Sequence, residues 1–261
     1  MSSSGIVVTR LAIAPVKAMR LLPVERVSLG SLGVRENRRF YWIDERDRMV
    51  NGKHVGALTA AVAEYDHPTR RLTVRFPAGG EVTAGVDVDG TVETAFFSHS
   101  VRARLVSGPF SEAISAQVGT RLRLVEGDPD RGGIDRGRVG GVSLISRASL
   151  AALAQIAGEP DVDARRFRML VEVDGLAAHG EDAWVEREVR VGAALVRMRG
   201  HVGRCAVTTR HPETGTVDLP TLQLLASYRR DAETTEALAF GIYGEVVEPG
   251  RVRLGDSVVP V

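Results

Sequence analysis

The sequence predicts a mainly β, barrel-like α+β fold, and two observations support this prediction. First, strand signals dominate: short runs that alternate apolar and polar residues, or that are rich in β-branched and aromatic residues, occur at residues 5–13, 40–43, 72–76, 101–105, 169–173, 189–191, 194–198 and 252–254. Second, helix signals are confined to residues 111–118, 146–157 and 221–228. Many short strands with scattered helices are typical of a barrel-like β architecture with helical additions.

The N-terminal strand signals are of two kinds. Residues 5–13, 72–76 and 101–105 alternate apolar and polar side chains, which is the period of a strand with one buried face. Residues 40–43, Phe-Tyr-Trp-Ile, form instead a continuous aromatic and β-branched run. This run ends at residues 44–47, Asp-Glu-Arg-Asp, whose composition predicts a turn.

Each predicted helix has a recognisable boundary signal. The strongest helix begins at Ser146, a good N-cap residue, and stops at Gly158 followed by Pro160. A shorter helix is closed by Gly119, and the third follows Pro220.

The bulk composition is that of an ordinary globular protein. The chain has 261 residues, 44% of them hydrophobic and 26% charged, which fits one large domain or two closely packed ones. A formal net charge of +1 gives no general reason to expect nucleic acid or a membrane as partner. The sequence has no leader-like N-terminus and no apolar stretch near the roughly 20 residues of a membrane helix. Its single cysteine excludes an intrachain disulfide, and we expect a soluble cytoplasmic protein.

Several common catalytic classes lose support because their motifs are absent. The chain contains no Gly-x-x-x-x-Gly-Lys-Ser/Thr phosphate loop, no Gly-x-Gly-x-x-Gly after a strand and no Gly-x-Ser-x-Gly elbow. The six histidines show no paired ligand spacing, and one cysteine excludes a zinc site built mainly from thiolates.

Cys205 stands out by its context. Residues 194–198 form a strand-like run into the segment 200–209, where Gly200 and Gly203 would let the backbone approach a ligand closely. The neighbouring Arg204 favours the thiolate, which is the form that binds metal or attacks an electrophile. From these residues alone, a buried structural cysteine is slightly the favoured interpretation, because free cysteine is among the most buried residue types.

Cationic side chains cluster in three segments. Lys17 stands in the first, Arg35, Arg38 and Arg39 in the second, and Arg165, Arg166 and Arg168 in the third. Arginine forks match phosphate oxygens, and lysine adds a point charge, so the segments could converge on one phosphorylated cofactor. The alternative, solvated surface charge, is favoured for most of these residues. Residues 127–141, rich in Gly, Asp and Arg, form the best candidate linker or mobile loop.

Two sets of motifs follow one another along the chain. The N-terminal set is Pro15-Val16-Lys17, Leu32-Gly33-Val34-Arg35 and Arg39-Phe40-Tyr41-Trp42. The C-terminal set is Arg166-Phe167-Arg168, Glu181-Asp182-Ala183-Trp184, Val191-Gly192, Arg204-Cys205, Thr208-Thr209, Pro212-Glu213-Thr214-Gly215, Phe240-Gly241-x-Tyr243 and Pro249-Gly250-x-Val252-x-Leu254-Gly255-Asp256. Through these residues nearly the whole chain resembles the MOSC family, named for the C-terminal part of molybdenum cofactor sulfurases. It resembles in particular the amidoxime-reducing components, which reduce N-hydroxylated compounds.

This resemblance implies a fold and a cofactor. Residues 1–125 would form an N-terminal β-barrel-like domain packed on a MOSC β-barrel of residues 126–261, with the molybdenum cofactor (molybdenum bound to molybdopterin) between them. Cys205 would ligate the metal as a soft thiolate, and the other sulfur ligands would come from the pterin dithiolene. The remaining implied site residues fall into three groups: Lys17, Arg39 and Arg168 for the pterin phosphate and scaffold, Arg204, Thr208 and Thr209 for the backbone around the ligand, and Tyr243 near the pocket.

The function implied is that of an oxidoreductase that reduces N-hydroxylated or related N–O compounds. Because the chain lacks the cysteines of an iron–sulfur cluster, electrons would come from a separate ferredoxin, flavin or haem protein. A sulfur carrier is an alternative, in which Cys205 takes a persulfide from a pyridoxal-phosphate-dependent cysteine desulfurase while binding no pyridoxal phosphate itself. A non-catalytic carrier of the cofactor is another, because Ala18, Leu170 and Gly203 replace polar residues of the reductases.

Overall fold

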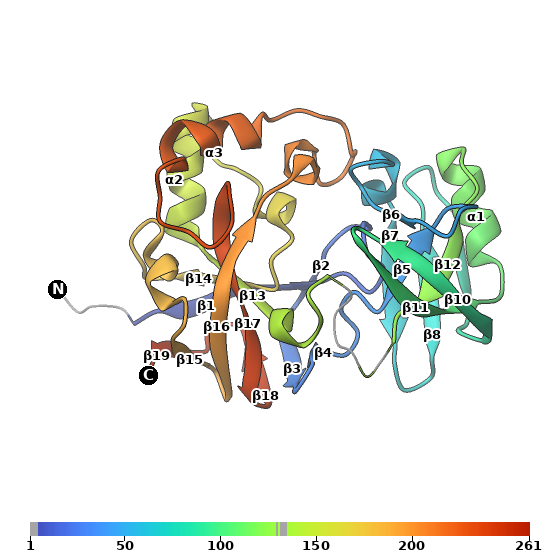
Figure 1. Cartoon of the computed structure of the whole chain (residues 1–261), viewed down its shortest axis with the longest axis horizontal. Coiled ribbons are helices and arrows are strands. Elements are labelled where there is room, and N and C mark those ends of the chain that lie inside the picture. Colours follow the sequence, from blue (N-terminus) through green and yellow to red (C-terminus); the bar gives the residue numbers. More distant parts are fainter. Residues whose placement is uncertain (1–4, 129, 131–134) are drawn as a thin grey trace.

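The computed structural model describes residues 5–128, 130 and 135–261, and within them the fold is mainly β with three α-helices. Figure 1 shows two groups of sheets side by side, the larger carrying helices α2 and α3 and the smaller carrying α1. The predicted mainly β α+β class is confirmed. None of the helices in this described part of the chain is long and apolar enough to cross a bilayer.

The larger group is built on an eight-stranded sheet. Its strand order is β19 (Val258–Pro260), β15 (Glu188–Val191), β16 (Ala194–Gly203), β17 (Ala239–Glu248), β13 (Val142–Ser146), β14 (Val171–Asp174), β1 (Val7–Ile13) and β2 (Leu22–Val24). A small sheet of β18 (Gly250–Arg253), β3 (Arg26–Gly30) and β4 (Gly33–Val34) shares its core, because Val252, Val27 and Leu29 pack into the same apolar cluster.

The smaller group contains the remaining two sheets. One has the order β10 (Val88–Phe96), β11 (His99–Val106), β12 (Arg123–Glu126), β5 (Phe40–Ile43) and β6 (Met49–Val50). The other pairs β7 (Val62–Asp66), β8 (Arg71–Arg75) and β9 (Glu81–Gly85). All four residues of β5 are buried, which explains why its sequence is continuously apolar rather than alternating.

The sheets are not the closed barrels that the resemblance implies. The eight-stranded order is open, since no ladder joins its end strands β19 and β2 among the described residues. The sheet is nevertheless curved: an isolated bridge pairs Val7 with Ser257, and the Val258 amide donates to the Ile6 carbonyl (2.8 Å). Residues 6–7 and 257–258, near the two ends of the chain, therefore lie side by side.

The three predicted helices are confirmed by their boundary contacts. Helix α2 (Arg147–Ala157) begins where the Ser146 hydroxyl accepts the Ser149 amide (3.1 Å), and it ends at Gly158 in the left-handed conformation. Helix α1 (Phe110–Val118) ends in the same way at Gly119, and α3 (Thr221–Arg229) follows Pro220. Five short 3-10 segments complete the described elements: η1 (Gly56–Ala60), η2 (Gly137–Gly140), η3 (Ala164–Phe167), η4 (Gly180–Trp184) and η5 (Ala206–Thr209).

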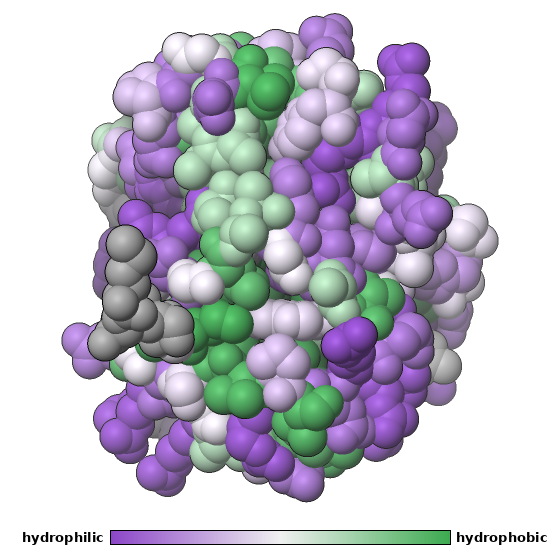
Figure 2. All heavy atoms as spheres, turned by 90° about the vertical axis from the view of Figure 1, so that its left-hand side faces the viewer, coloured by the Kyte–Doolittle hydropathy of each residue, from purple (hydrophilic) through white to green (hydrophobic). Residues whose placement is uncertain are grey.

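One edge of the large sheet is apolar and exposed. Figure 2 views the side of the molecule that carries β15 and β19, and hydrophobic side chains gather on its lower part. Val259 in β19 and Val261 after it are 52% and 78% exposed. Because β19 has only three residues and ends in Pro260, which lacks an amide hydrogen, this edge offers little backbone for pairing with another chain.

Candidate functional site

The cysteine singled out by the sequence lies at the end of β16, where the strand gives way to η5. The backbone of Cys205 is extended, and its carbonyl accepts both the amide and the hydroxyl of Thr208 (3.0 Å each). The Thr209 hydroxyl donates to the Ala206 carbonyl (2.8 Å). The thiol itself is exposed, so Cys205 is not a buried structural residue. The two threonines thus hold the turn that presents an accessible sulfur.

The two glycines before the cysteine serve the protein's own packing. A side chain at Gly203 would meet the Glu236 carboxylate (2.6 Å) and the Ala237 carbonyl (3.1 Å). At Gly200 it would meet the Thr235 hydroxyl (2.9 Å). The expectation that these glycines leave room for a ligand is therefore wrong. They let the segment 235–237 lie against β16 beside the cysteine.

Lys17 and Arg204 lie close enough to Cys205 to interact with its charge, and Arg38, Arg136 and Arg168 act on one or both of these two cations. We call Lys17, Arg38, Arg136, Arg168 and Arg204 the cation cluster. Lys17 and Arg38 share one counterion, since the Lys17 ammonium and an Arg38 guanidinium nitrogen both contact the Asp135 carboxylate. Arg38 also donates to the Arg168 carbonyl (2.9 Å), which ties the second and third cationic segments together.

The other members of the cation cluster approach from the large sheet. Arg136 forms a two-pronged pair with Glu236 (2.5 and 3.0 Å), and its guanidinium lies 4.2 Å from the centre of the Tyr243 ring. Arg204 donates to the carbonyls of Phe240 and Phe167 (2.8 Å each). The structure therefore places Tyr243 and Arg204 in this region as well.

Arg168 closes the set from η3. Its guanidinium donates to the Met19 carbonyl (2.7 Å), and its own backbone is left-handed with φ +55°. A positive φ is unfavourable for residues other than glycine, so this residue stores strain of about 1 kcal/mol or more. The guanidinium reaches the segment after β1, which also carries Lys17.

The electrostatics of the cation cluster are unusual because cations outnumber their counterions. Burial, then Arg38 and Arg168, hold the pKa of Lys17 well below its ordinary value. Burial, then Arg168 and Arg136, lower the pKa of Arg38 to about 9, and burial foremost lowers the pKa of Arg204 to about 9. Only Asp135 and Glu236 pair with the cation cluster among the described residues. Such a site attracts anions.

Arg39, which the sequence predicts as a phosphate ligand, points elsewhere. Its guanidinium pairs with the fully buried Glu126 (2.6 Å), a carboxylate that also receives Arg70 (3.4 Å) and Arg104 (2.7 Å). A cavity of about 450 Å³ adjoins this ion pair, and both Arg38 and Arg39 line it. Arg39 thus faces the cavity, whereas Arg38 reaches the cation cluster. Nothing in the sequence separates these two neighbouring arginines.

Sequence reasoning also missed Arg136, Asp135 and Glu236. Asp135 and Arg136 stand in the segment 127–141, which composition marked only as a linker; its residues 129 and 131–134 lie outside the described part of the chain. No motif marked Glu236. Its pairing with Arg136 spans 100 residues and has no local signature.

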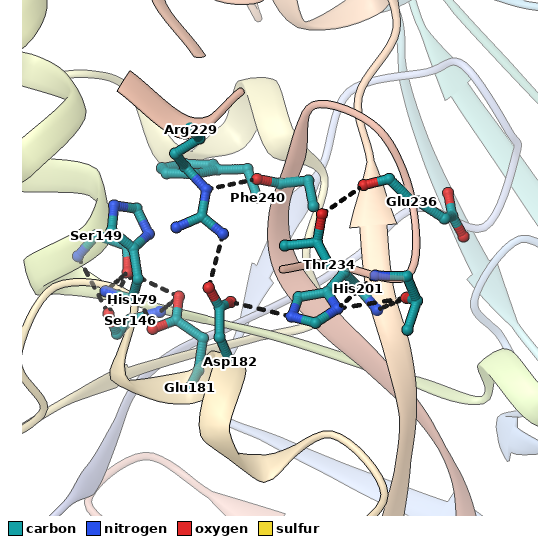
Figure 3. Close-up of polar contacts among 12 residues, drawn as sticks. Ser146, Ser149, His179, Glu181, Asp182, His201, Arg229, Thr234, Glu236 and Phe240 are labelled. Atoms are coloured by element: carbon teal, nitrogen blue, oxygen red, sulfur yellow. Dashed lines mark hydrogen bonds and ion pairs between the residues drawn. The ribbon is translucent and has the colours of Figure 1, made fainter. Parts of the chain in front are cut away.

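A second polar network joins η4, α3 and β16 to the segment that carries Glu236 (Figure 3). The buried Glu181 in η4 accepts the Ser149 hydroxyl (2.8 Å), and its neighbour Asp182 binds Arg229 of α3 (2.6 Å). Asp182 also faces the His201 ring (3.6 Å). His201 accepts the Thr235 amide through Nδ1 (3.1 Å), so the network fixes the loop that carries Glu236.

No group of three or more His, Cys, Asp or Glu residues is placed to hold a metal ion by itself within residues 5–128, 130 and 135–261. A metal at Cys205 would need most of its ligands from a cofactor. The donor set fits such a group, because an exposed thiol lies beside an excess of cations that a phosphate would neutralise.

Comparison with known proteins agrees with these observations. Residues 135–259 match the family model of the MOSC domain. The chain is 26% identical to mitochondrial amidoxime-reducing component 1 of Xenopus laevis over 286 residues, covering 98% of this chain and 82% of that protein. It is 33% identical to mitochondrial amidoxime reducing component 2 of Bos taurus over 123 residues, covering 45% of this chain and 36% of that protein.

Among solved structures, the YUAD protein from Bacillus subtilis matches with a TM-score of 0.45 and 13% identity, covering 97% of this chain and 93% of that one. The family assignment rests on the sequence matches, which include the segment that carries Cys205. Residues 135–259 match the MOSC domain family, and the chain is similar in sequence to amidoxime-reducing component proteins.

Proposed function

We propose that this protein is a molybdenum-cofactor-binding oxidoreductase that reduces N-hydroxylated or related N–O compounds. Electrons arrive from a separate donor protein of the ferredoxin, flavin or haem type. The observation that carries the proposal is the exposed Cys205 beside a cluster of five cations, with which two carboxylates pair among the described residues. The names of the similar proteins supply the reaction class.

Different residues would bind different parts of the cofactor. Cys205 would bind the metal, and Lys17, Arg38 and Arg168 would hold the phosphate and pterin. Arg39, which is paired with Glu126, would line the adjoining cavity instead. When bound, the cofactor supplies a metal that passes two electrons to the N–O bond.

Other side chains would set charge and orientation. Arg204, held by two backbone carbonyls, places its guanidinium beside Cys205, where its charge is attracted to a thiolate. Thr208 and Thr209 fix the turn around the sulfur, and Tyr243 holds the Arg136 guanidinium over its ring. These contacts keep the sulfur accessible and its surroundings positive.

The three departures from the reductase pattern have local explanations. Ala18 is buried with φ +73°, and Leu170 lies in the apolar core of the large sheet. Gly203 makes room for Glu236 and Ala237. None of the three offers a polar side chain to a cofactor, so phosphate binding would rest on the cation cluster. Substrate choice would differ from that of the reductases.

The decisive experiment is elemental analysis of molybdenum in wild type and in Cys205→Ser, both produced in a host that makes the cofactor. Serine replaces a soft sulfur ligand with a hard oxygen, so molybdenum content should fall severalfold or the visible spectrum should change. Thr209→Ser is the matched control, because it alters the same turn and leaves the sulfur in place. Wild type without molybdenum, or equal metal and equal spectra in Cys205→Ser, would refute the proposal.

The exposed thiol also favours a second candidate, a sulfur carrier. In that reaction the persulfide of a cysteine desulfurase transfers its outer sulfur to Cys205; the donor returns to a thiol and Cys205 becomes a persulfide. Intact-protein mass would rise by one sulfur and return to its starting value on adding a reductant.

A non-catalytic carrier of the molybdenum cofactor would behave differently from both. It would bind the cofactor in stoichiometric amount and reduce no N–O substrate with any electron donor.

A further inference from the structure

We propose that Phe97, at the tip of the β10–β11 hairpin, stacks on the substrate and selects planar, conjugated N-hydroxylated compounds. This inference rests on the proposed function and names the substrate class of the same site. The geometry of the hairpin does not favour an aromatic residue at position 97. The ring of Phe97 nevertheless lies beside the cation cluster.

The backbone at the hairpin tip is better suited to another residue. Phe96 pairs with His99, so the loop has two residues, and Phe97 takes the first position with φ +54°. Two-residue hairpin loops with a positive φ at the first position favour glycine there, and a bulky side chain at that position is strained. The turn alone would thus be more stable without the aromatic ring.

The ring of Phe97 is both exposed and firmly held. It is 66% exposed, more than any other aromatic side chain among the described residues, yet it packs edge-on against the fully buried Phe96 at 5.1 Å between ring centres. An exposed ring on a buried support presents a flat apolar surface at small entropic cost.

The ring borders the proposed cofactor site. The Lys17 ammonium lies 5.8 Å from the centre of the Phe97 ring, and Lys17 belongs to the cation cluster around Cys205. In Figure 1 the tip of the β10–β11 hairpin turns toward the large sheet that carries β16 and β17. The hairpin therefore brings an aromatic face from the smaller group of sheets to the edge of a site built mainly by the larger one.

The reaction of the proposed substrate is a two-electron reduction. An amidoxime, two electrons and two protons give an amidine and water, with the electrons from the separate donor protein and the protons from solvent.

The first test compares two amidoximes that share a head group, one with an aryl and one with a methyl substituent. Phe97→Asn removes the ring and fits the positive φ, so the melting temperature should hold or rise. For the aryl compound kcat/KM should fall about 3- to 10-fold, mainly through KM, and for the methyl compound it should stay within about twofold. Val88→Asn, at the other end of β10, is the matched control and should change neither value.

The second test needs no turnover. In Phe97→Trp the new indole is exposed, while the native Trp42 and Trp184 are buried, so its emission reports on the hairpin tip. The aryl amidoxime should quench it saturably at concentrations where the methyl compound does not. Equal losses for both substrates in Phe97→Asn, or no selective quenching in Phe97→Trp, would overturn the proposal. A wild-type protein without molybdenum would instead refute the proposed function. The quenching experiment would still show whether residue 97 contacts the aryl compound.

Discussion

The positive charge of Lys17 is disfavoured by burial and by the guanidinium groups of Arg38 and Arg168. Its side chain is 13% exposed, and its pKa is lowered by burial, then by Arg38 and Arg168. Asp135 offsets this repulsion only in part, because it also binds Arg38. A protein selected for stability alone would place an apolar residue here, because replacing buried charge with an apolar side chain of similar volume is often neutral or stabilising, and Asp135 would keep Arg38 as its partner.

We therefore predict opposite effects of Lys17→Met on stability and on cofactor binding. The cofactor-free variant should gain about 0.5–1 kcal/mol in free energy of unfolding, measured by urea denaturation. Retained pterin, measured as the fluorescence of its oxidised form, should fall at least about tenfold, because a phosphate contact is lost. Arg121→Gln removes a cation that is 85% exposed and should leave both unchanged. A Lys17→Met protein that retains all its pterin would contradict this assignment.

At the scale of elements, the strongest sequence signals were the boundaries of helices. Ser146, Gly158 and Gly119 act through contacts within a few residues, so local sequence was sufficient. Strand β17 was not predicted because Gly241 and Gly244 interrupt its pattern. Side chains at these two positions would collide with the carbonyls of Leu144 and Arg197 in the neighbouring strands. The sheet therefore requires glycine at the same positions that obscure the strand pattern in the sequence.

The candidate site was predictable where the motifs are local. Cys205, Arg204 and the two threonines lie within one segment, and the structure brings them together as the sequence suggested. Which of Arg38 and Arg39 joins the cation cluster depends on partners 87 to 130 positions away. Those long-range pairings leave no trace in the local pattern.

The element η4 carries a titratable group that ties stability to pH. His179 precedes η4 with a buried ring against Tyr228 of α3 (5.6 Å). Burial, then Arg229, lowers its pKa to about 4, although Asp182 opposes this. Both ring nitrogens lack a hydrogen-bond partner among the described residues. The folded state therefore holds the neutral imidazole, while the unfolded chain binds a proton below its ordinary pKa of 6.5.

We predict that stability falls as the solution is acidified from pH 7 to pH 5 and that His179 causes part of this loss. The contribution is fully present above pH 6.5 and declines toward pH 4, by about 1–2 kcal/mol at pH 5. His179→Asn tolerates the left-handed backbone and cannot titrate there, so its urea midpoint should change less between the two pH values. Equal pH dependence in both proteins would show that His179 does not carry the effect.

At the scale of the whole molecule, the division into residues 1–125 and 126–261 remains a prediction. Strand pairing crosses it: β1 lies between β14 and β2 in the large sheet, and Val8 and Leu11 belong to that sheet's core. The two segments are thus separate in sequence but share one apolar core.

We predict that residues 126–261 alone do not unfold cooperatively, because the sheet lacks β1 and its buried side chains. Fusing residues 5–34 after Val261 through a short linker should restore a cooperative urea transition, since residues 6–7 lie beside residues 257–258. The matched control carries Val8→Asp and Leu11→Asp in the fused segment and should not be rescued. A cooperative transition in residues 126–261 without the fusion would show that β1 is dispensable.

The position of β1 also has a consequence for biosynthesis. The Thr9 hydroxyl donates to the Glu172 carbonyl, a contact between residues 163 positions apart. At ordinary translation rates β14 leaves the ribosome roughly 10 to 30 s after β1. During that interval the nascent chain presents an apolar strand without its neighbour, a state prone to aggregation that chaperones bind. The smaller group of sheets can fold during this interval. We therefore infer that this group folds first and that β1 pairs with β14 only after the second half of the chain has been synthesised.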